Sequence, residues 1–161
     1  MEIIKISQVN DALAEMVALF RVELRSYKGI TSKPDIEAAR EEMEEYLIAG
    51  FPVFAAIVDG EYAGYVVCRV DSEVVWVESI LVKDEYRRQG IASALHSKAE
   101  DIAAFYGDDT VYNYVHPNNH RMIAFLRKRG YTVLNLIEIR KPYQGEQPTQ
   151  TICVGEHEFD Y

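Results

Sequence analysis

A strand, a short basic loop and a helix follow one another in the stretch Ile80-Leu81-Val82-Lys83-Asp84-Glu85-Tyr86-Arg87-Arg88-Gln89-Gly90-Ile91-Ala92-Ser93-Ala94-Leu95. Small residues open the helix, so Gly90 and Ala92 let another group approach the backbone closely. The first N–H groups of a helix have no partner within it and lie at the positive end of its dipole. A phosphate or pyrophosphate fits there. The simpler interpretation is a strand-to-helix turn with solvated arginines.

Two amphipathic helices are expected near the start of the chain, after a strand at Ile3 to Ile6. Ser7 or Asn10 caps the first, and the second begins after Pro34 and ends at Gly50. Their apolar positions have helical spacing: Leu13, Met16, Val17, Phe20 and Leu24 in the first, and Ile36, Ala39, Met43, Tyr46 and Leu47 in the second.

Three strands then follow in direct succession. Asp59-Gly60 predicts a hairpin between strands at 51–58 and 62–70. A turn at 71–73 leads to a third strand at 74–82. Strands joined by such short turns form an antiparallel meander.

The chain after residue 90 alternates between helices and strands. A helix to about Gly107 is followed by a strand at Thr110 to Val115, a helix from 117–119 to Gly130, and a strand at Tyr131 to Ile139. This alternation is typical of crossover units with parallel pairing. The sequence therefore predicts one mixed α/β domain over residues 1–161.

Residues 141–161 form a C-terminal extension of uncertain order, with a last strand expected at Thr151 to Val154 and an acidic, aromatic end at 155–161. This tail either lines a site for a cationic acceptor or simply covers a sheet edge or a second copy in a homodimer. The second role is the simpler one.

Composition excludes several classes of protein. The 161 residues include 17 basic and 26 acidic ones, a net charge of −9, which argues against nucleic acid and anionic membranes as partners. Cys68 and Cys153 form no CxxC pair, and the longest apolar uncharged stretch, 48–58, is too short to span a membrane. The N-terminus has no signal-peptide h-region, so we expect a cytoplasmic protein.

Three common ligand motifs are absent. The stretch is neither a P-loop nor a GxGxxG dinucleotide motif. His116 and His120 are four residues apart, but Pro117 interrupts the helical geometry between them, and no further ligand completes a zinc site. We therefore expect no metal.

Two motifs together resemble one enzyme family. Arg87-x-x-Gly90-x-Ala92 after an apolar strand resembles the Q/R-x-x-G-x-G/A signature of the GNAT acetyltransferase superfamily. The segment from Asn119 to Tyr131 is similar to that family's N-x-x-A-x-x-F-Y-x-K-x-G-F helix. The order of elements fits over residues 1 to about 140. Residues 83–129 carry 8 basic and 6 acidic side chains, although the rest of the chain is strongly acidic, which suits a polyanionic ligand.

The resemblance implies acetyl-CoA as co-substrate and assigns it binding residues. Backbone amides from Arg88 to Ser93 would hold the pyrophosphate, and the strand edge would pair with the pantetheine arm. Asn119 would contact the pantetheine, or else only cap its helix, and Phe125 would line the wall, or else only pack in the core. The cofactor-binding set is Ile80, Leu81, Val82, Arg87, Arg88, Gln89, Gly90, Ile91, Ala92, Ser93, Asn119 and Phe125.

Two catalytic residues follow from the chemistry of acetyl transfer to an amine. Glu78 is a charge on an apolar strand, where by parity it shares a face with Trp76 and Ile80. Its carboxylate would accept the ammonium proton directly or through water, and the alternative is a merely solvated side chain. By family analogy the N–H of Leu81 would stabilise the oxyanion.

One position departs from the family pattern. The Tyr that usually protonates the leaving thiolate is replaced by Leu126, which carries no proton to give. Tyr114 and Tyr131 are candidate substitutes, and packing is the simpler role for both.

The resemblance therefore implies an N-acetyltransferase that acts by direct attack in a ternary complex. Its acceptor would be a small cationic amine or a peptide N-terminus. The alternative suggested by Leu126 is a non-catalytic CoA-binding sensor or assembly module on the same scaffold. A structural protein that binds no nucleotide is the third interpretation.

Overall fold

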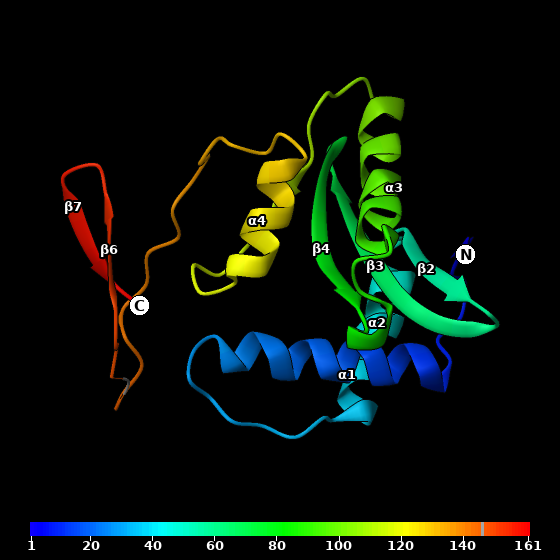
Figure 1. Ribbon diagram of the computed structural model, residues 1–161, viewed down its shortest axis with the longest axis horizontal. Helices are drawn as coiled ribbons and strands as arrows, with labels where there is room; N and C mark the ends of the chain where they lie inside the picture. The colour runs from blue at the N-terminus through cyan, green and yellow to red at the C-terminus, as the bar shows by residue number, and fades with distance from the viewer. Residues whose placement is uncertain (146) are drawn as a thin grey trace. The chain divides into compact units, whose positions relative to one another are not determined.

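The computed structural model describes residues 1–145 and 147–161. Its contacts divide the chain into two compact units, Met1–His116 and Pro117–Tyr161. In the described residues, the first unit contains a five-stranded sheet with helices α1, α2 and α3, and the second contains helix α4 and a hairpin (Figure 1). Each unit is described by itself.

The sheet of the first unit has the strand order β1-β2-β3-β4-β5. Its strands are β1 (Glu2–Lys5), β2 (Val53–Val58), β3 (Glu61–Asp71), β4 (Val74–Val82) and β5 (Tyr112–Asn113). The first three pairings are antiparallel and the β4–β5 pairing is parallel, which confirms the predicted meander and crossover. Asp59 and Gly60 both have positive φ, as a two-residue hairpin turn requires.

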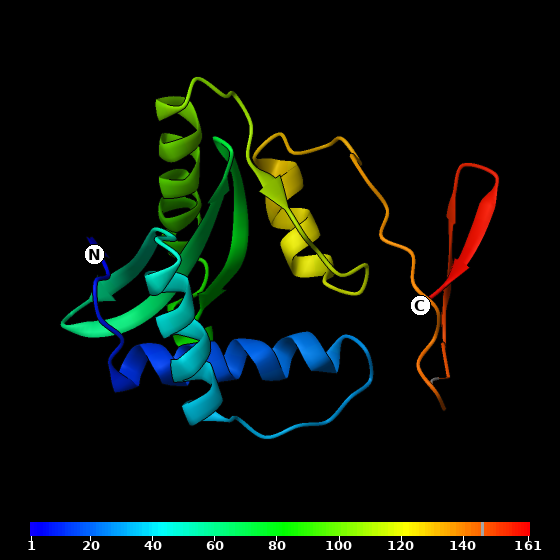
Figure 2. The same ribbon diagram turned by 180° about the vertical axis from the view of Figure 1, so that it is seen from behind.

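Helices α1 (Asp11–Ser26) and α2 (Ile36–Ile48) cover one face of the sheet and cross one another (Figures 1 and 2). Asn10, one of the two predicted caps, accepts a hydrogen bond from the Leu13 amide at 2.9 Å. The fully buried Tyr65 of β3 packs its ring edge-on against Phe20 of α1. The core on this face is formed by Leu13, Met16, Val17, Ala39, Met43, Val53, Ala55, Tyr65, Val67 and Leu81.

Helix α3 (Ile91–Phe105) covers the opposite face. Gly64 is the neighbour of Tyr65 in β3, so the α-hydrogen that stands in place of a side chain points to that face. A Cβ at Gly64 would lie 2.6 Å from the Leu81 carbonyl oxygen and 3.2 Å from Leu95 of α3. Glycine therefore permits the close packing of β3, β4 and α3.

A β-bulge interrupts β4 in its middle. Val67 pairs with Ser79 and Cys68 with Val77, so Glu78 is an extra residue without a partner in the register. The bulge shifts every later side chain by one position relative to the faces of the sheet. Trp76 pairs with Arg69 and Ile80 with Val66, three residues away in β3, so Trp76 and Ile80 lie on opposite faces. The parity prediction that placed Ile80 on the face of Trp76 is wrong for this reason.

The second half of the chain is less regular than the sequence predicts. Of the strand expected at 110–115, only β5 forms, and residues 131–139 form no strand in the described part of the chain. Alternating apolar residues give residues 131–139 the propensity to form a strand, but they do not specify a strand with which to pair. Helix α4 (His120–Lys128) ends before Gly130, as predicted. The last predicted strand forms as β6 (Thr151–Val154), which pairs with β7 (His157–Asp160).

The close contact at Gly64 leads to a test of the fold. Gly64→Ala would force β4 or α3 away from β3, and overpacking of this kind costs about 1–3 kcal/mol. We expect urea denaturation to show that loss of unfolding free energy. Glu61→Ala, an exposed substitution in the same strand, should stay within about 0.5 kcal/mol of the wild type. Equal stability of the two variants would contradict the packing described here.

Candidate functional site

The loop between β4 and α3 leaves the first amides of α3 available. Arg88 and Gly90 both have positive φ, and this turns the chain back directly before Ile91. A Cβ at Gly90 would meet nothing within 4 Å, so the turn is open on that side. Side chains cap α1 and α2, but none caps α3 among the described residues. The positive end of this 15-residue helix therefore presents uncommitted N–H donors.

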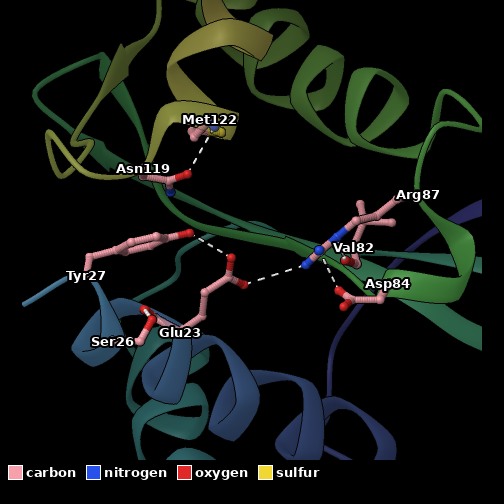
Figure 3. A network of polar contacts seen from close by, with 8 residues as sticks. All are labelled: Glu23, Ser26, Tyr27, Val82, Asp84, Arg87, Asn119 and Met122. Carbon is pink, nitrogen blue, oxygen red and sulfur yellow. Dashed lines mark hydrogen bonds and ion pairs between the residues drawn. The ribbon is translucent and has the colours of Figure 1, made fainter. Parts of the chain in front are cut away.

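Arg87 holds this loop in place (Figure 3). Its Nε donates to the Val82 carbonyl at 3.0 Å, and its terminal nitrogens lie 2.5 Å from Asp84 and 3.6 Å from Glu23 of α1. The guanidinium is thus bound to three oxygens from β4, the loop and α1. Its position indicates a role in shaping the loop, while Arg88 is exposed and extends from the turn.

The last turn of α1 connects the ends of β4 and β5. Glu23 contacts Arg87, which follows β4, and accepts a hydrogen bond from Tyr27 at 2.7 Å (Figure 3). The Tyr27 ring stacks on His116, which follows β5, with 6.1 Å between the centroids. Burial, and then the positive charge of Lys28, lower the pKa of His116. These contacts join the two strands where the sheet opens.

The sheet opens because β5 pairs with β4 only at Trp76 and Val77. In the described residues, no strand covers the rest of that edge of β4. The Lys83 amide donates a hydrogen bond to the Ala63 carbonyl at 3.0 Å. Hydrogen-bonded pairs recur every second residue in an antiparallel ladder, so Leu81 and Tyr65 form the next such pair. The backbone groups of Ile80 and Val82 point the other way, toward the open edge. The Val82 carbonyl there already accepts the hydrogen bond from Arg87.

The bulge directs Glu78 toward Arg69 of β3. Glu78 Oε2 lies 3.2 Å from Arg69 Nε, and the two side chains are 29% and 30% exposed. The Arg69 guanidinium lies over the indole of Trp76, 4.5 Å from the ring centroid. Trp76 in turn contacts the ring of Tyr112 at 5.6 Å. Glu78 and Trp76 thus share a face, as predicted, and Glu78 is half-buried and ion-paired.

A second ion pair lies on the same face, between the two helices. Arg21 Nε of α1 is 2.8 Å from Glu42 of α2, which also accepts a hydrogen bond from Tyr46 at 2.9 Å. Burial and the nearby Glu42 carboxylate raise the pKa of the Tyr46 phenol above its ordinary value, and Glu78 contributes to this. Glu78 therefore lies close enough to Tyr46 to affect its pKa, while Glu42 is itself paired with Arg21.

The family of the chain follows from a family model. The model described as the acetyltransferase (GNAT) family matches residues 15–131. The chain belongs to this family. The match includes β4, the basic loop, α3 and α4, which hold the site residues predicted from the sequence.

Known GNAT relatives and folds agree with this assignment. The N-alpha-acetyltransferase of Saccharolobus solfataricus is 29% identical over 111 residues, and the match covers 61% of this chain and 65% of that protein. The chain thus spans less than two thirds of that relative. The aminoglycoside acetyltransferase AAC(6')-Iy, solved with a bisubstrate analogue, is 22% identical, with a TM-score of 0.65 over 88% of this chain and 98% of that one. A Bacillus halodurans protein is 15% identical, with a TM-score of 0.70 over 89% and 99%. These structures share the GNAT fold.

The second GNAT motif lies in the second unit, on α4. Asn119 accepts a hydrogen bond from the Met122 amide at 3.0 Å, which confirms its capping role (Figure 3). The ring of Phe125 is half-buried, and the guanidinium of Arg129 lies 5.8 Å from its centroid. Leu126, at the family's tyrosine position, is buried.

Cys68 is not available as a nucleophile. It lies buried in β3, and burial raises the pKa of its thiol to about 12. Cys153 is exposed, on β6 of the second unit.

In the described residues, no group of three or more His, Cys, Asp or Glu side chains is arranged to hold a metal ion. Among the same residues, no helix combines the length and apolar character that a membrane span requires.

Three residues of the site, Glu23, Tyr27 and Arg69, escaped the sequence prediction. Glu23 and Tyr27 are four apart on a helix, which places them on one face, but only the tertiary structure brings Glu23 to Arg87. Arg69 was missed because the bulge that brings Glu78 to it has no signature in the sequence.

The contacts of Arg87 lead to a prediction about the loop. Arg87→Gln removes a charged group from three oxygens, and hydrogen bonds to charged groups contribute about 1.5–3 kcal/mol. We expect amide hydrogen exchange over residues 83–90 to accelerate at least about tenfold. Arg88→Gln is the matched control, because Arg88 makes no polar contact with any described residue. Unchanged exchange in Arg87→Gln would show that the loop does not depend on this side chain.

The burial of Cys68 leads to a second prediction. With a pKa of about 12, its thiolate is about a thousandfold rarer at pH 8 than that of an ordinary thiol. We expect Ellman's reagent to modify one thiol rapidly in the folded protein and two in urea. Cys153→Ala should leave no rapidly reacting thiol. Rapid modification of Cys68 in the folded Cys153→Ala variant would show that the strand is accessible.

Proposed function

We propose that this GNAT chain is an acetyl-CoA-dependent N-acetyltransferase. The observation that carries the proposal is the uncapped N-terminus of α3 beside an open edge of β4. A diphosphate fits the first feature, because free N–H groups and the helix dipole favour an anion. An extended amide chain fits the second, because it pairs with a strand edge as an added strand does.

The cofactor-binding residues divide by role. Backbone amides from Arg88 to Ser93 would hold the pyrophosphate, with Gln89, Ile91 and Ala92 contributing main-chain atoms. Arg87 would act as a positioning residue, since three oxygens already bind its guanidinium. Ile80 and Val82 would bind the pantetheine amides. Asn119 and Phe125, in the second unit, remain candidate cofactor-binding residues.

The oxyanion donor needs an N–H group that points to the open edge. The amide of Leu81 points to β3, with which it pairs, whereas the amide of Ile80 points to the open edge of β4. We therefore assign the oxyanion to the N–H of Ile80 and leave Leu81 with a packing role on the α1 face. One such donor is worth roughly 3 kcal/mol of transition-state stabilisation.

The transfer step is a direct attack in a ternary complex. The amine nitrogen forms a bond to the thioester carbonyl carbon, the C–S bond breaks, and the electron pair leaves with sulfur. Glu78 accepts one proton of the ammonium directly or through water, and the nitrogen loses its second proton to the departing thiolate or to water as the C–S bond breaks. A covalent cysteine intermediate is disfavoured, because burial keeps Cys68 protonated.

Leu126 cannot donate a proton to the leaving thiolate. A thiol with a pKa near 8.5 leaves tolerably well without one. Tyr114 is 66% exposed and lies near Arg69 of the first unit, so it is the better placed of the two tyrosines relative to Glu78. Tyr131 belongs to the second unit.

The acceptor is an amine. The relatives include an N-alpha-acetyltransferase and an aminoglycoside acetyltransferase, so a peptide N-terminus and a small molecule are both represented among them. The second candidate function, favoured by Leu126, is a CoA-binding sensor or assembly module without catalysis.

Glu78→Gln separates the two functions. An essential general base contributes roughly 10²–10⁴-fold, so we expect a loss of that size in the rate of CoA thiol release with an amine panel. CoA at 100 times its Kd should still stabilise the variant by about 2.7 kcal/mol in thermal unfolding. Glu61→Gln, an exposed carboxylate on β3, is the control for charge. Full activity of Glu78→Gln would remove the base assignment, and no stabilisation of the wild type by CoA would remove the enzyme proposal.

A further inference from the structure

Arg69 is held on two sides by groups of the first unit. Its Nε lies 3.2 Å from Glu78, and its guanidinium carbon lies 4.5 Å from the ring centroid of Trp76 and 5.9 Å from that of Tyr114. The ring of Tyr112 contacts the indole, with 5.6 Å between the centroids. Such stacking between a guanidinium and aromatic rings fixes the plane of the charged group.

The outer edge of this guanidinium is not used by the protein. The Nε atom is buried within ion-pair distance of Glu78 but makes no hydrogen bond with any described residue, and the two terminal nitrogens make none either. Since the side chain is 30% exposed, these terminal nitrogens are its solvent-facing part. Two parallel N–H donors in a fixed plane match the geometry of a carboxylate.

The neighbouring cation on the same face is committed elsewhere. Arg21 is bound to Glu42, which also accepts from Tyr46. Long-range attraction does not explain how an anion would be held, because the net charge of the chain is −9. A fixed guanidinium in direct contact would be needed, and Arg69 provides one beside the carboxylate of Glu78.

We propose that the acceptor is a small amine that also carries a carboxylate, as an amino acid does, and that Arg69 determines this specificity. The carboxylate binds the terminal nitrogens of Arg69 while the ammonium lies at Glu78. This inference rests on the proposed function for the reaction and adds the class of acceptor. It differs from the expectation of a small cationic amine or a peptide N-terminus, which the family resemblance implied.

The competing explanation gives Arg69 a structural role only. In that case the guanidinium neutralises Glu78 and covers Trp76, and the charge on the acceptor does not matter. Both roles predict some loss of stability in Arg69 variants. Only the specificity role predicts that the loss of activity depends on the carboxylate of the acceptor.

The test compares each acceptor with its amide. A panel of L-amino acids, their C-terminal amides, β-alanine, γ-aminobutyrate, spermidine and kanamycin is assayed for CoA thiol release. We expect kcat/KM for the acids to exceed that for the amides by about 10- to 150-fold, the contribution of a charged hydrogen-bond pair. Arg69→Gln should abolish this ratio by slowing the acids alone, and Arg69→Lys should restore only part of it, because Lys lacks the planar fork.

Arg40→Gln is the matched control. Arg40 also forms an ion pair, with Asp11, and is similarly exposed at 32%, but its other contact is the Val9 carbonyl and not Glu78. We expect it to keep the ratio between acids and amides. Amides or spermidine that react as well as the acids, or a ratio unchanged in Arg69→Gln, would overturn the proposal while leaving the acetyltransferase function intact.

A binding measurement decides the question even without turnover. Trp76 is the only tryptophan of the chain, so its fluorescence reports directly on the ring that contacts Arg69. Amino acids should change its emission saturably, whereas their amides should not, and the change should disappear in Arg69→Gln. Circular dichroism checks that the variants are folded. Absence of any response to acids in the wild type, with CoA bound and without it, would overturn the proposal.

Discussion

Strand β4 is fully paired on one edge and nearly bare on the other, and most of the site depends on this asymmetry. β3 binds it along its whole length, whereas β5 touches it at two residues only. Backbone groups on a bare edge remain strong donors and acceptors, so they need either water or a ligand. One of these backbone groups, the Val82 carbonyl, already accepts a hydrogen bond from Arg87. The other backbone donors and acceptors on this edge of β4 are available to pair with an extended amide ligand.

The bulge at Glu78 gives the same strand a second function. Without the extra residue, strict alternation would place Trp76, Glu78 and Ile80 on one face. With it, Glu78 and Trp76 meet Arg69 while the backbone of Ile80 faces the open edge. One inserted residue thus brings a carboxylate and a free N–H group close together along the chain but directs them differently. Bulges commonly occur beside active sites for this reason.

Sequence patterns predicted the helices, the meander and the parallel crossover, but not how far each strand pairs. The Asp59-Gly60 turn fixed the meander, and the apolar spacing of α1 and α2 was sufficient to identify both helices. Residues 131–139 have the pattern of a strand, yet form none in the described chain, because pairing depends on a partner that the pattern does not specify. Arg87 was identified as a site residue from its motif, but its three oxygen partners come from segments up to 64 residues away in sequence. The motif therefore predicted the loop, and only tertiary contacts explain how the loop is held.

The positive charges of this acidic protein are used in two different ways. The guanidinium of Arg87 has a structural role, because it contacts oxygens of Glu23, Asp84 and Val82. The backbone amides of the loop are then the groups that would bind an anion. Arg69 has one carboxylate partner and two aromatic neighbours, and its terminal donors make no hydrogen bond with any described residue. A rigid cation with unused donors is costly to keep half-buried unless something binds it. That difference between two superficially similar arginines, at opposite ends of β4, is the physical reason for assigning loop geometry to one and acceptor choice to the other.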